Sequence, residues 1–499
     1  MNTKKGIFKN TLYNFAGSAF PLVIAVFTIP FLLRGLGTEK FGILSLAWVM
    51  IGYFSIADLG LSRALTKLVS EKMGQGKRFE LPSLIWTALS LMTIMGVVGA
   101  SILALLSPVL VRSILKIEST NIADILNSFY VLSIAIPFTI GGAGLRAILE
   151  ALMRFDLSNY VRIALGVFNF LGPAIVLLFS KNILFVVIIL AVSRVISLIV
   201  YLKACFAVLP EMKKKVVFCK SEVVPLLKFG GWITVSNMIS PIMVSFDRFF
   251  LGAMVAVSAL AYYSTPWEIV TKLLIIPASL AGVLFPVFSQ LEGRKNLPSS
   301  DIYYRSLKYV LLIMFPFCLI CTSFAKEILQ VWLGHEFAYS AFRIMQIMAV
   351  AVLLNGMAAI PFSLIQATGK PDITAKFHLM EVVLYIPVLW LLIKKWGIIG
   401  AALAWLIRVA IDLFLLLYYS NKFILPGFAK SPNNKILAAE YSVLMMIIII
   451  ILPAYFDNLT AKIFTTIFAL IVYAAVSWKG LLDTNEKKYI TDKLRWNSD

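Results

Sequence analysis

Long apolar segments recur along almost the whole chain and alternate with short polar stretches. Most of them approach or exceed the length of about 20 residues that an α-helix needs to cross the hydrocarbon core of a membrane. A transmembrane barrel would instead show shorter segments of alternating polarity. The pattern therefore predicts an all-α integral membrane protein with about fourteen transmembrane helices. The predicted spans are 11–33, 41–62, 84–107, 126–146, 159–180, 183–203, 228–252, 257–285, 304–325, 340–366, 376–393, 397–420, 436–456 and 459–480.

The pattern also repeats coarsely after about 220 residues. The segments 11–33 and 228–252 carry mid-helix prolines at matching places, Pro21 and Pro241. Six predicted spans separate the two starts, so both halves enter the membrane in the same direction. Such a parallel repeat is related by an axis along the membrane normal. We predict two six-helix lobes related by a pseudo-twofold, and two extra C-terminal helices. The boundaries are 1–207 for the N-terminal lobe, 208–225 for a basic linker, 226–422 for the C-terminal lobe, 436–482 for the last two helices and 483–499 for a cytoplasmic tail.

Charge is scarce but strongly biased. Only 14% of the residues are charged and 60% are hydrophobic, yet the formal net charge is +20. The Lys and Arg residues concentrate in alternate loops, with an excess of about threefold on the side shared by the two termini. The positive-inside rule then places both termini in the cytoplasm and explains the basic balance without a nucleic-acid partner.

The loops limit the kinds of chemistry expected. None is long enough to hold a separate domain, and no P-loop pattern is present. Cys318 and Cys321 have the spacing of a metal-binding pair, but no second pair or hard ligand lies nearby. We therefore interpret them as packing residues and expect no metal site, no organic cofactor and no catalytic residue.

Eight charged residues fall deep inside predicted spans. Each costs about 3 kcal/mol on insertion scales, or on the order of 20 kcal/mol together if all faced lipid. They must therefore face water, a lumen or one another. These residues are Arg194, Asp247, Arg248, Glu268, Lys272, Glu381, Arg408 and Asp412.

Spacing separates the residues that can pair locally from those that cannot. Glu268 and Lys272 lie four residues apart, as do Arg408 and Asp412, so each pair shares a helix face and can neutralise itself. Local pairing and substrate binding both remain open for these four. Arg194 has no acidic residue within four positions, which makes it a candidate anion-binding group or half of a cross-helix salt bridge.

Two further pairs stand out. Asp247 and Arg248 are adjacent and point about 100° apart on a helix, so they cannot satisfy each other. Asp58 and Arg63 lie near the predicted cytoplasmic end of the second span. Asp58 can cap the turn there, pair with Arg63 or take part in a cytoplasmic gate.

A series of short motifs runs through both halves of the chain. They are Asn10-Thr-Leu-Tyr-Asn14, Pro30, Gly35-Leu-Gly37, Phe41-Gly42 and Asp58-Leu-Gly60 in the first half, and Phe246-Asp247-Arg248, Leu251-Gly252, Tyr262, Pro286 and Gln366-Ala-Thr-Gly-Lys-Pro371 in the second. These motifs resemble those of polysaccharide (O-antigen-type) flippases, a family of the multidrug/oligosaccharidyl-lipid/polysaccharide exporter superfamily. The resemblance covers essentially the whole chain.

The resemblance implies two lobes around a central cavity that opens to each side of the membrane in turn. The implied substrate is an oligosaccharide linked through diphosphate to a polyprenol such as undecaprenol. It would move from the cytoplasmic to the outer leaflet of a bacterial or archaeal plasma membrane for surface polysaccharide, including O-antigen and lipopolysaccharide, synthesis. Implied partners are membrane lipids and the polysaccharide polymerase machinery, and the buried acids are candidates for binding a coupling Na⁺ or H⁺. The candidate substrate-binding residues are Arg194, Arg248, Lys272, Arg408, Asp247 and Glu268, and the candidate gating residues are Asp58 and Arg63.

Two other functions fit parts of the pattern. A cation-coupled multidrug exporter of the same superfamily would need a cavity dominated by carboxylates, and the basic residues at Arg194, Arg248 and Lys272 argue against cationic drugs. A membrane glycosyltransferase or polymerase would need an outer domain or a carboxylate or metal cluster, and the sequence offers neither.

Overall fold

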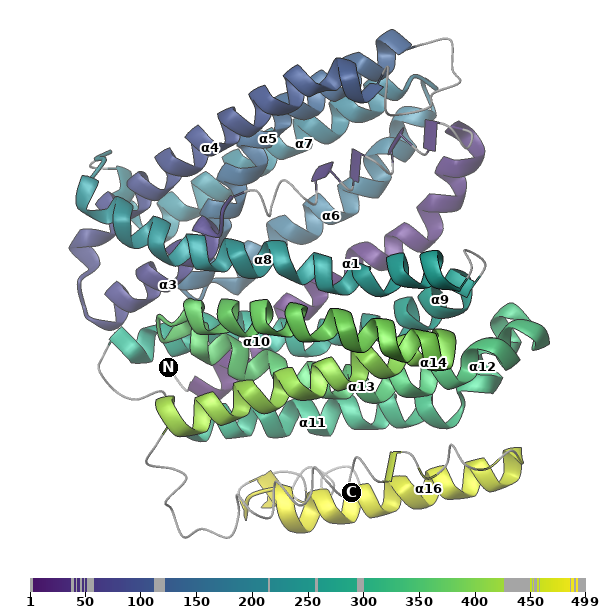
Figure 1. Ribbon diagram of the computed structural model, residues 1–499. Helices are drawn as coiled ribbons and strands as arrows, with labels where there is room; N and C mark the ends of the chain where they lie inside the picture. The colour runs from purple at the N-terminus through teal and green to yellow at the C-terminus, as the bar shows by residue number, and fades with distance from the viewer. Residues whose placement is uncertain are drawn as a thin grey trace, which may run out of the picture. The chain divides into compact units, whose positions relative to one another are not determined.

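In the computed structural model, α-helices form nearly all of the described secondary structure (Figure 1). The structure describes residues 3–36, 58–111, 122–213, 216–255, 259–293, 300–425, 458–484 and 486–488, with isolated positions between them. Most of the predicted span 436–456 and almost half of the span 41–62 lie outside the described residues. The main helices are α1 (Thr3–Leu36), α3 (Leu61–Gly74), α4 (Leu81–Val109), α5 (Ile122–Ala151), α6 (Phe155–Leu177), α7 (Ile183–Val208), α8 (Lys220–Met254), α9 (Ala259–Thr271), α10 (Ile275–Gly293), α11 (Ser300–Ser323), α12 (Ala325–Leu333), α13 (His335–Ala367), α14 (Pro371–Tyr419) and α16 (Leu459–Val476).

Ten helical stretches of the described chain are long and apolar enough to cross a membrane. Their outer faces expose large apolar side chains such as Phe27, Leu105 and Ile134, with exposures of 74%, 79% and 64%. A contiguous apolar exterior of this kind suits contact with lipid rather than water. The multi-pass membrane architecture predicted from hydropathy is confirmed.

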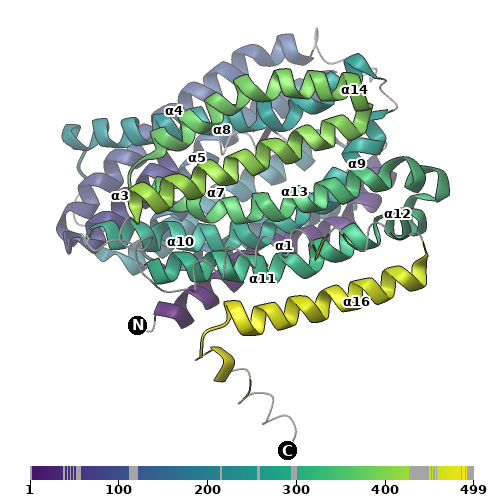
Figure 2. The same ribbon diagram turned by 60° about the horizontal axis from the view of Figure 1, so that its bottom comes forward.

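The chain divides into two compact units, and each unit combines three separate segments of the sequence. The first unit holds Met1–Met238, Ser279–Asn296 and Gln366–Ala375, and the second holds Ile239–Ala278, Leu297–Ile365 and Lys376–Asp499. The lobe boundaries expected from the sequence remain predictions. In the first unit, α4, α5 and α7 lie side by side (Figure 1). In the second unit, Figure 2 shows α13 running alongside α14.

Close helix packing in the first unit depends on glycine. A Cβ atom added at Gly96 of α4 would lie 2.7 Å from the Cα atom of Pro137 in α5. Small residues allow this close approach, which strengthens packing where lipid gives no hydrophobic driving force between helices.

The predicted repeat is visible as matching contacts in the first unit. The Ser70 hydroxyl donates to the carbonyl of Ala151 at 3.3 Å, and the Ser289 hydroxyl donates to the carbonyl of Ala367 at 3.4 Å. The two serines lie about 220 residues apart, as do the two alanines. Helix α3 therefore meets α5 in the same way that α10 meets the end of α13, as a parallel repeat requires.

The ends of α3 and α10 also cross each other within the first unit. A Cβ atom added at Gly74 would lie 2.1 Å from the carbonyl oxygen of Gln290, and one added at Gly293 would lie 2.1 Å from that of Glu71. The two glycines are again about 220 residues apart. The repeat-related helices thus touch backbone to backbone, and each uses a glycine to make room for the other.

Helix α14 contains a sharp reversal that the sequence predicted as a boundary between two spans. Gly397 has φ 56° and ψ −132°, a conformation that residues with a Cβ atom rarely adopt. The halves on either side face each other, because the rings of Phe377 and Tyr419 lie 6.1 Å apart and Arg408 reaches Glu381. The predicted spans 376–393 and 397–420 therefore form a helical hairpin.

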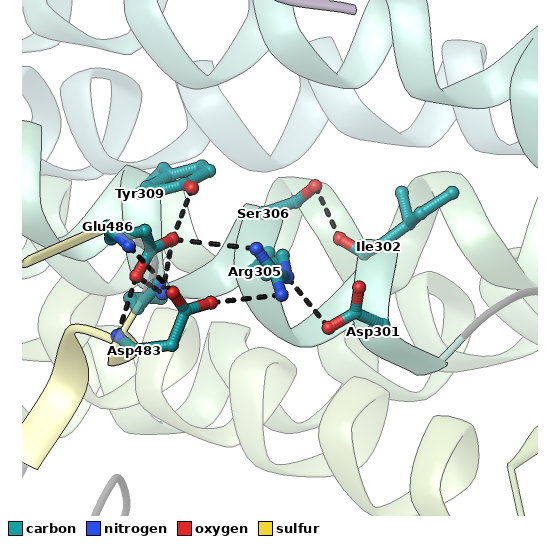
Figure 3. A network of polar contacts seen from close by, with 8 residues as sticks. Asp301, Ile302, Arg305, Ser306, Tyr309, Asp483 and Glu486 are labelled. Carbon is teal, nitrogen blue, oxygen red and sulfur yellow. Dashed lines mark hydrogen bonds and ion pairs between the residues drawn. The ribbon is translucent and has the colours of Figure 1, made fainter. Parts of the chain in front are cut away.

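A polar network attaches the end of the last span to α11 in the second unit (Figure 3). Arg305 contacts Asp483 at 2.9 Å, and the Lys308 ammonium donates to Glu486 at 2.6 Å. The backbone amides of Asp483 and Glu486 each donate to the other's carboxylate at 2.8 Å, which is the reciprocal pattern of a capping box. Because these charges are paired with one another, we interpret the network as structural.

Candidate functional site

The first unit contains a group of arginines that we call the arginine group: Arg63 on α3, Arg146 on α5 and Arg162 on α6. Its acidic neighbours are Glu150, which lies one helical turn after Arg146 at 3.4 Å and within electrostatic range of Arg63 and Arg162, and Asp58, which lies within electrostatic range of Arg146. Three guanidinium groups against two neighbouring carboxylates leave an excess of positive charge, and such a group can bind an anion.

Local structure sets the direction of each arginine. Helices α5 and α6 are joined by a short turn in which Met153 has φ 60°, so Arg146 and Arg162 come from neighbouring helices. The Arg162 guanidinium donates to the side-chain oxygen of Asn14 at 3.2 Å, and the Arg63 guanidinium lies 4.9 Å from the ring centre of Phe285. The arginines are therefore held by α1 and α10 while Glu150 balances only part of their charge.

The arginine group remains accessible although protein surrounds it. The side chain of Arg146 is 39% exposed and Arg63 is also exposed, whereas Ala64 and Leu65 beside Arg63 are fully buried. The exposed guanidinium groups of Arg63 and Arg146 are reachable from outside the protein. Their donors are available to a ligand.

Arg194 of α7 is buried rather than exposed, with 6% of its surface accessible. One of its terminal nitrogens donates to the side-chain oxygen of Asn169 on α6, and its Nε atom lacks a hydrogen-bond partner. Among the described residues, its hydrogen-bonding partner is thus an amide rather than a carboxylate. Its predicted role as an anion-binding residue stays a prediction.

Asp58 caps the start of α3. Its carboxylate accepts from the backbone amides of Gly60 at 2.9 Å and Ser62 at 3.0 Å, at a turn where Leu59 and Gly60 have positive φ angles. The capping alternative is therefore formed, while Arg63 belongs to the arginine group. A gating role for Asp58 and Arg63 stays a prediction.

In the second unit, Asp247 and Arg248 point to different partners, as their helical spacing predicted. Asp247 is 1% exposed and accepts from the Tyr263 hydroxyl and, at 2.7 Å, from the backbone amide of Arg248. The Arg248 guanidinium lies 4.5 Å from the ring centre of Trp267 and 3.9 Å from Glu268. Its Nε and Nη2 atoms have no hydrogen-bond partner. Asp247 therefore has partners, whereas Arg248 keeps free donors.

The Glu268–Lys272 pair forms as the spacing allows, with 2.9 Å between the charged atoms. Both side chains are open, at 52% and 66% exposure. Lys272 begins a short 3₁₀ turn between α9 and α10, a feature often found at hinges. This pair and Arg248 form one charged, accessible face of the second unit beside an aromatic ring.

Arg408 contacts an acid that the sequence did not suggest. Its Nη1 atom lies 3.5 Å from Glu381 in the other half of α14, rather than pairing with Asp412 alone. Glu381 is 3% exposed, and the carboxyl groups of Glu381 and Asp412 lie within hydrogen-bonding reach of each other. His378, on the same half of α14 as Glu381, stacks on Phe362 with ring centres 5.6 Å apart.

The sequence analysis missed four residues as parts of the site: Arg146, Glu150, Arg162 and Asn169. Helix α5 extends to Ala151 and α6 begins at Phe155, so these helices reach beyond the predicted spans 126–146 and 159–180. The four-residue spacing of Arg146 and Glu150 was the available signal. Among the described residues, no three His, Cys, Asp or Glu side chains gather into a metal site.

Comparisons with known proteins identify the family. A family model described as polysaccharide biosynthesis protein matches residues 7–292. A putative O-antigen transporter of Shigella flexneri is 35% identical over 412 residues, which cover 82% of this chain and 96% of that protein. The chain belongs to the polysaccharide biosynthesis protein family. The resemblance drawn from the sequence motifs is confirmed.

One more distant relative and one solved structure are also similar to this chain. The lipopolysaccharide biosynthesis protein WzxC of Escherichia coli K12 is 24% identical over 199 residues, or 40% of each chain. The solved Vibrio cholerae MATE transporter VcmN in its bent form has a TM-score of 0.72 at 18% identity, covering 84% of this chain and 96% of that one. This likeness confirms the predicted fold class, a helical transporter fold.

Proposed function

We propose that the protein is a flippase that moves a polyprenyl-diphosphate-linked oligosaccharide from the cytoplasmic to the outer leaflet of the plasma membrane. The family assignment and the O-antigen transporter of Shigella flexneri support the substrate class. The observation that carries the proposal in this chain is the arginine group, whose three positive charges exceed the two negative charges of its neighbours Glu150 and Asp58. A diphosphate matches it because each guanidinium can donate two parallel hydrogen bonds to phosphate oxygens.

The substrate has three chemically different parts, and the described residues suggest a place for two of them. The arginine group would hold the diphosphate. Within the second unit taken by itself, the half-buried Trp267 offers an aromatic face that suits a sugar ring, and Glu268 and Lys272 add exposed polar groups. The polyprenol would stay in the bilayer, because moving this apolar chain from lipid into the protein would gain no free energy. Arg194, Asp247 and Arg408 would support these groups from the interior.

The alternating charge of the loops supports a cytoplasmic location for both termini. The cycle would be coupled to a cation gradient, since this chain has buried carboxyl groups that could bind Na⁺ or H⁺. The arginine group opposes a cationic drug as the main substrate. No step of the proposal makes or breaks a glycosidic bond, so the protein would act as a transporter rather than as an enzyme.

The test is translocation in proteoliposomes. Purified protein is reconstituted with a labelled undecaprenyl-diphosphate oligosaccharide, and an impermeant glycosidase reports the label in the outer leaflet. Arg146→Ala should slow protein-dependent movement roughly 10-fold to 100-fold, since a hydrogen bond to a charged group contributes about 1.5–3 kcal/mol. Arg146→Lys should fall between, because it keeps the charge and loses the planar fork.

The matched control is Arg154→Ala. Arg154 lies at the turn between the same two helices, but it pairs with Asp156 at 2.8 Å, so its positive charge is balanced. Its loss should leave the rate close to that of the wild type. Equal effects of Arg146→Ala and Arg154→Ala on the rate of movement would show that the arginine group does not bind the substrate. Formation of new glycosidic bonds by the pure protein would overturn the transporter assignment.

A further inference from the structure

A second polar group lies inside the second unit and is separate from the arginine group. It joins the two halves of α14 through Glu381, Arg408 and Asp412. Glu381 is 3% exposed, yet its Oε1 atom has no hydrogen-bond partner, and the same is true of the buried Oδ1 atom of Asp412. Two unpartnered, buried carboxyl oxygens within reach of each other are costly unless something binds between them.

The local charges do not balance if both acids are ionised. Two carboxylates that lie this close in an apolar helical hairpin repel each other, and one guanidinium neutralises only one of them. The contact from Arg408 to Glu381 is long at 3.5 Å, and the Arg408 Nε atom has no partner. A single proton shared by the two carboxyl groups would supply the missing hydrogen bond and leave one negative charge for Arg408.

Arg408 also faces a third acid. The same Nη1 atom lies 3.7 Å from the sulfur of Met243 on α8, and Arg408 is within electrostatic range of Asp247, one turn further along that helix. Asp247 in turn accepts from the backbone amide of Arg248, whose side chain points to Trp267. Arg408 therefore stands between the acid pair of α14 and the helix that carries the free donors of Arg248.

We propose that Glu381 and Asp412 form a proton-binding site that shares one proton and controls the position of Arg408. With the proton bound, the pair carries one negative charge, and Arg408 interacts electrostatically with both the pair and Asp247. When the proton leaves to water, the pair carries two negative charges and draws Arg408 away from α8. This inference rests on the proposed transport function and deepens it by naming the coupling ion and its residues.

The remaining groups around the pair favour a proton over a metal cation. The Arg408 guanidinium already lies beside the two carboxyl groups, and it would repel a metal cation bound between them. His378 lies on the face of α14 within electrostatic range of Arg408, as does the Tyr385 ring at 5.9 Å. On the adjoining helices α8 and α9, Asp247 contacts the Tyr263 hydroxyl and the backbone amide of Arg248, and Glu268 lies 3.9 Å from the Arg248 guanidinium.

The first test is independent of any substrate. Infrared spectroscopy of the purified full-length protein should show a protonated-carboxyl stretch that persists at neutral pH and shifts in D₂O. Asp412→Asn and Glu381→Gln, which keep size and polarity, should each remove it. Asp156→Asn, at an exposed carboxylate paired with Arg154, should leave it unchanged. Absence of the band from the folded wild-type protein would overturn the proposal without bearing on the flippase function.

The second test measures coupling in the proteoliposomes described above. For one proton per cycle, a gradient of one pH unit should shift the leaflet distribution of the labelled undecaprenyl-diphosphate oligosaccharide about tenfold. Asp412→Asn should keep movement down the substrate gradient and lose this shift. A shift that survives in Asp412→Asn and in Glu381→Gln, or one that follows Na⁺ instead of pH, would overturn the proposal. A wild-type protein that moves no substrate would refute the flippase function instead.

Discussion

Replacing Gly74 or Gly293 with alanine tests the backbone crossing of α3 and α10. A Cβ atom at either position would lie 2.1 Å from a carbonyl oxygen, of Gln290 in one case and of Glu71 in the other. Neither neighbour is a flexible side chain, so the two backbones must separate by roughly 1 Å. Overpacking of this size costs about 1–3 kcal/mol. We therefore expect each single variant to lower the free energy of unfolding by that amount.

The reciprocal geometry makes a second, sharper prediction for these glycines. Once the helices have moved apart for one methyl group, the second methyl finds room already made. The double variant should therefore lose clearly less stability than the sum of the two single losses, because residues that share a backbone shift are not additive. The measurement is unfolding of the purified protein by SDS titration in mixed micelles.

Gly231→Ala is the matched control, since a Cβ atom there meets nothing within 4 Å. Its stability should stay unchanged or rise by up to about 1 kcal/mol, because alanine favours a helix over glycine. Losses that are strictly additive in the double variant would refute the reciprocal crossing. A loss for Gly231→Ala as large as that for Gly74→Ala would show that helical glycines matter for a reason other than this contact.

Three further variants each test a single residue. Glu486→Gln should destabilise the attachment of the chain after α16 by about 1.5–3 kcal/mol, measured by proteolysis of the tail, because the carboxylate accepts from Lys308. Burial alone would raise the pKa of Glu486, but hydrogen bonds from Lys308 and Tyr309 outweigh it and lower that pKa. A lowered pKa means that the attachment is intact above the ordinary glutamate value of about 4.3 and weakens as the pH falls below it; protection that is unchanged at low pH would contradict this. Gly397→Ala should lower the apparent melting temperature through about 1–3 kcal/mol of backbone strain, whereas a neutral result would show that α14 can relax its reversal. Lys462→Met should detach α16 from α12 because Lys462 is buried against Glu327 at 2.8 Å, and retained resistance of α16 to proteolysis would argue otherwise.

The sequence by itself determined the membrane architecture, the family and the repeat. Apolar segments of membrane-spanning length are local features, and lipid requires the backbone within them to form helices. The Pro21 and Pro241 pattern therefore gave the offset that recurs in the contacts of Ser70 and Ser289. Four-residue spacing likewise gave the Glu268–Lys272 pair, since one helical turn fixes which side chains are neighbours.

Only the tertiary structure decided which distant charges meet. Arg63, Arg146 and Arg162 come from three helices, and their proximity depends on how those helices pack rather than on any spacing within one of them. Arg408 meets Glu381 because Gly397 reverses α14, although its nearer neighbour in sequence is Asp412. Periodicity within a helix reaches only one or two turns, whereas the anion group and the acid pair both arise from contacts between helices.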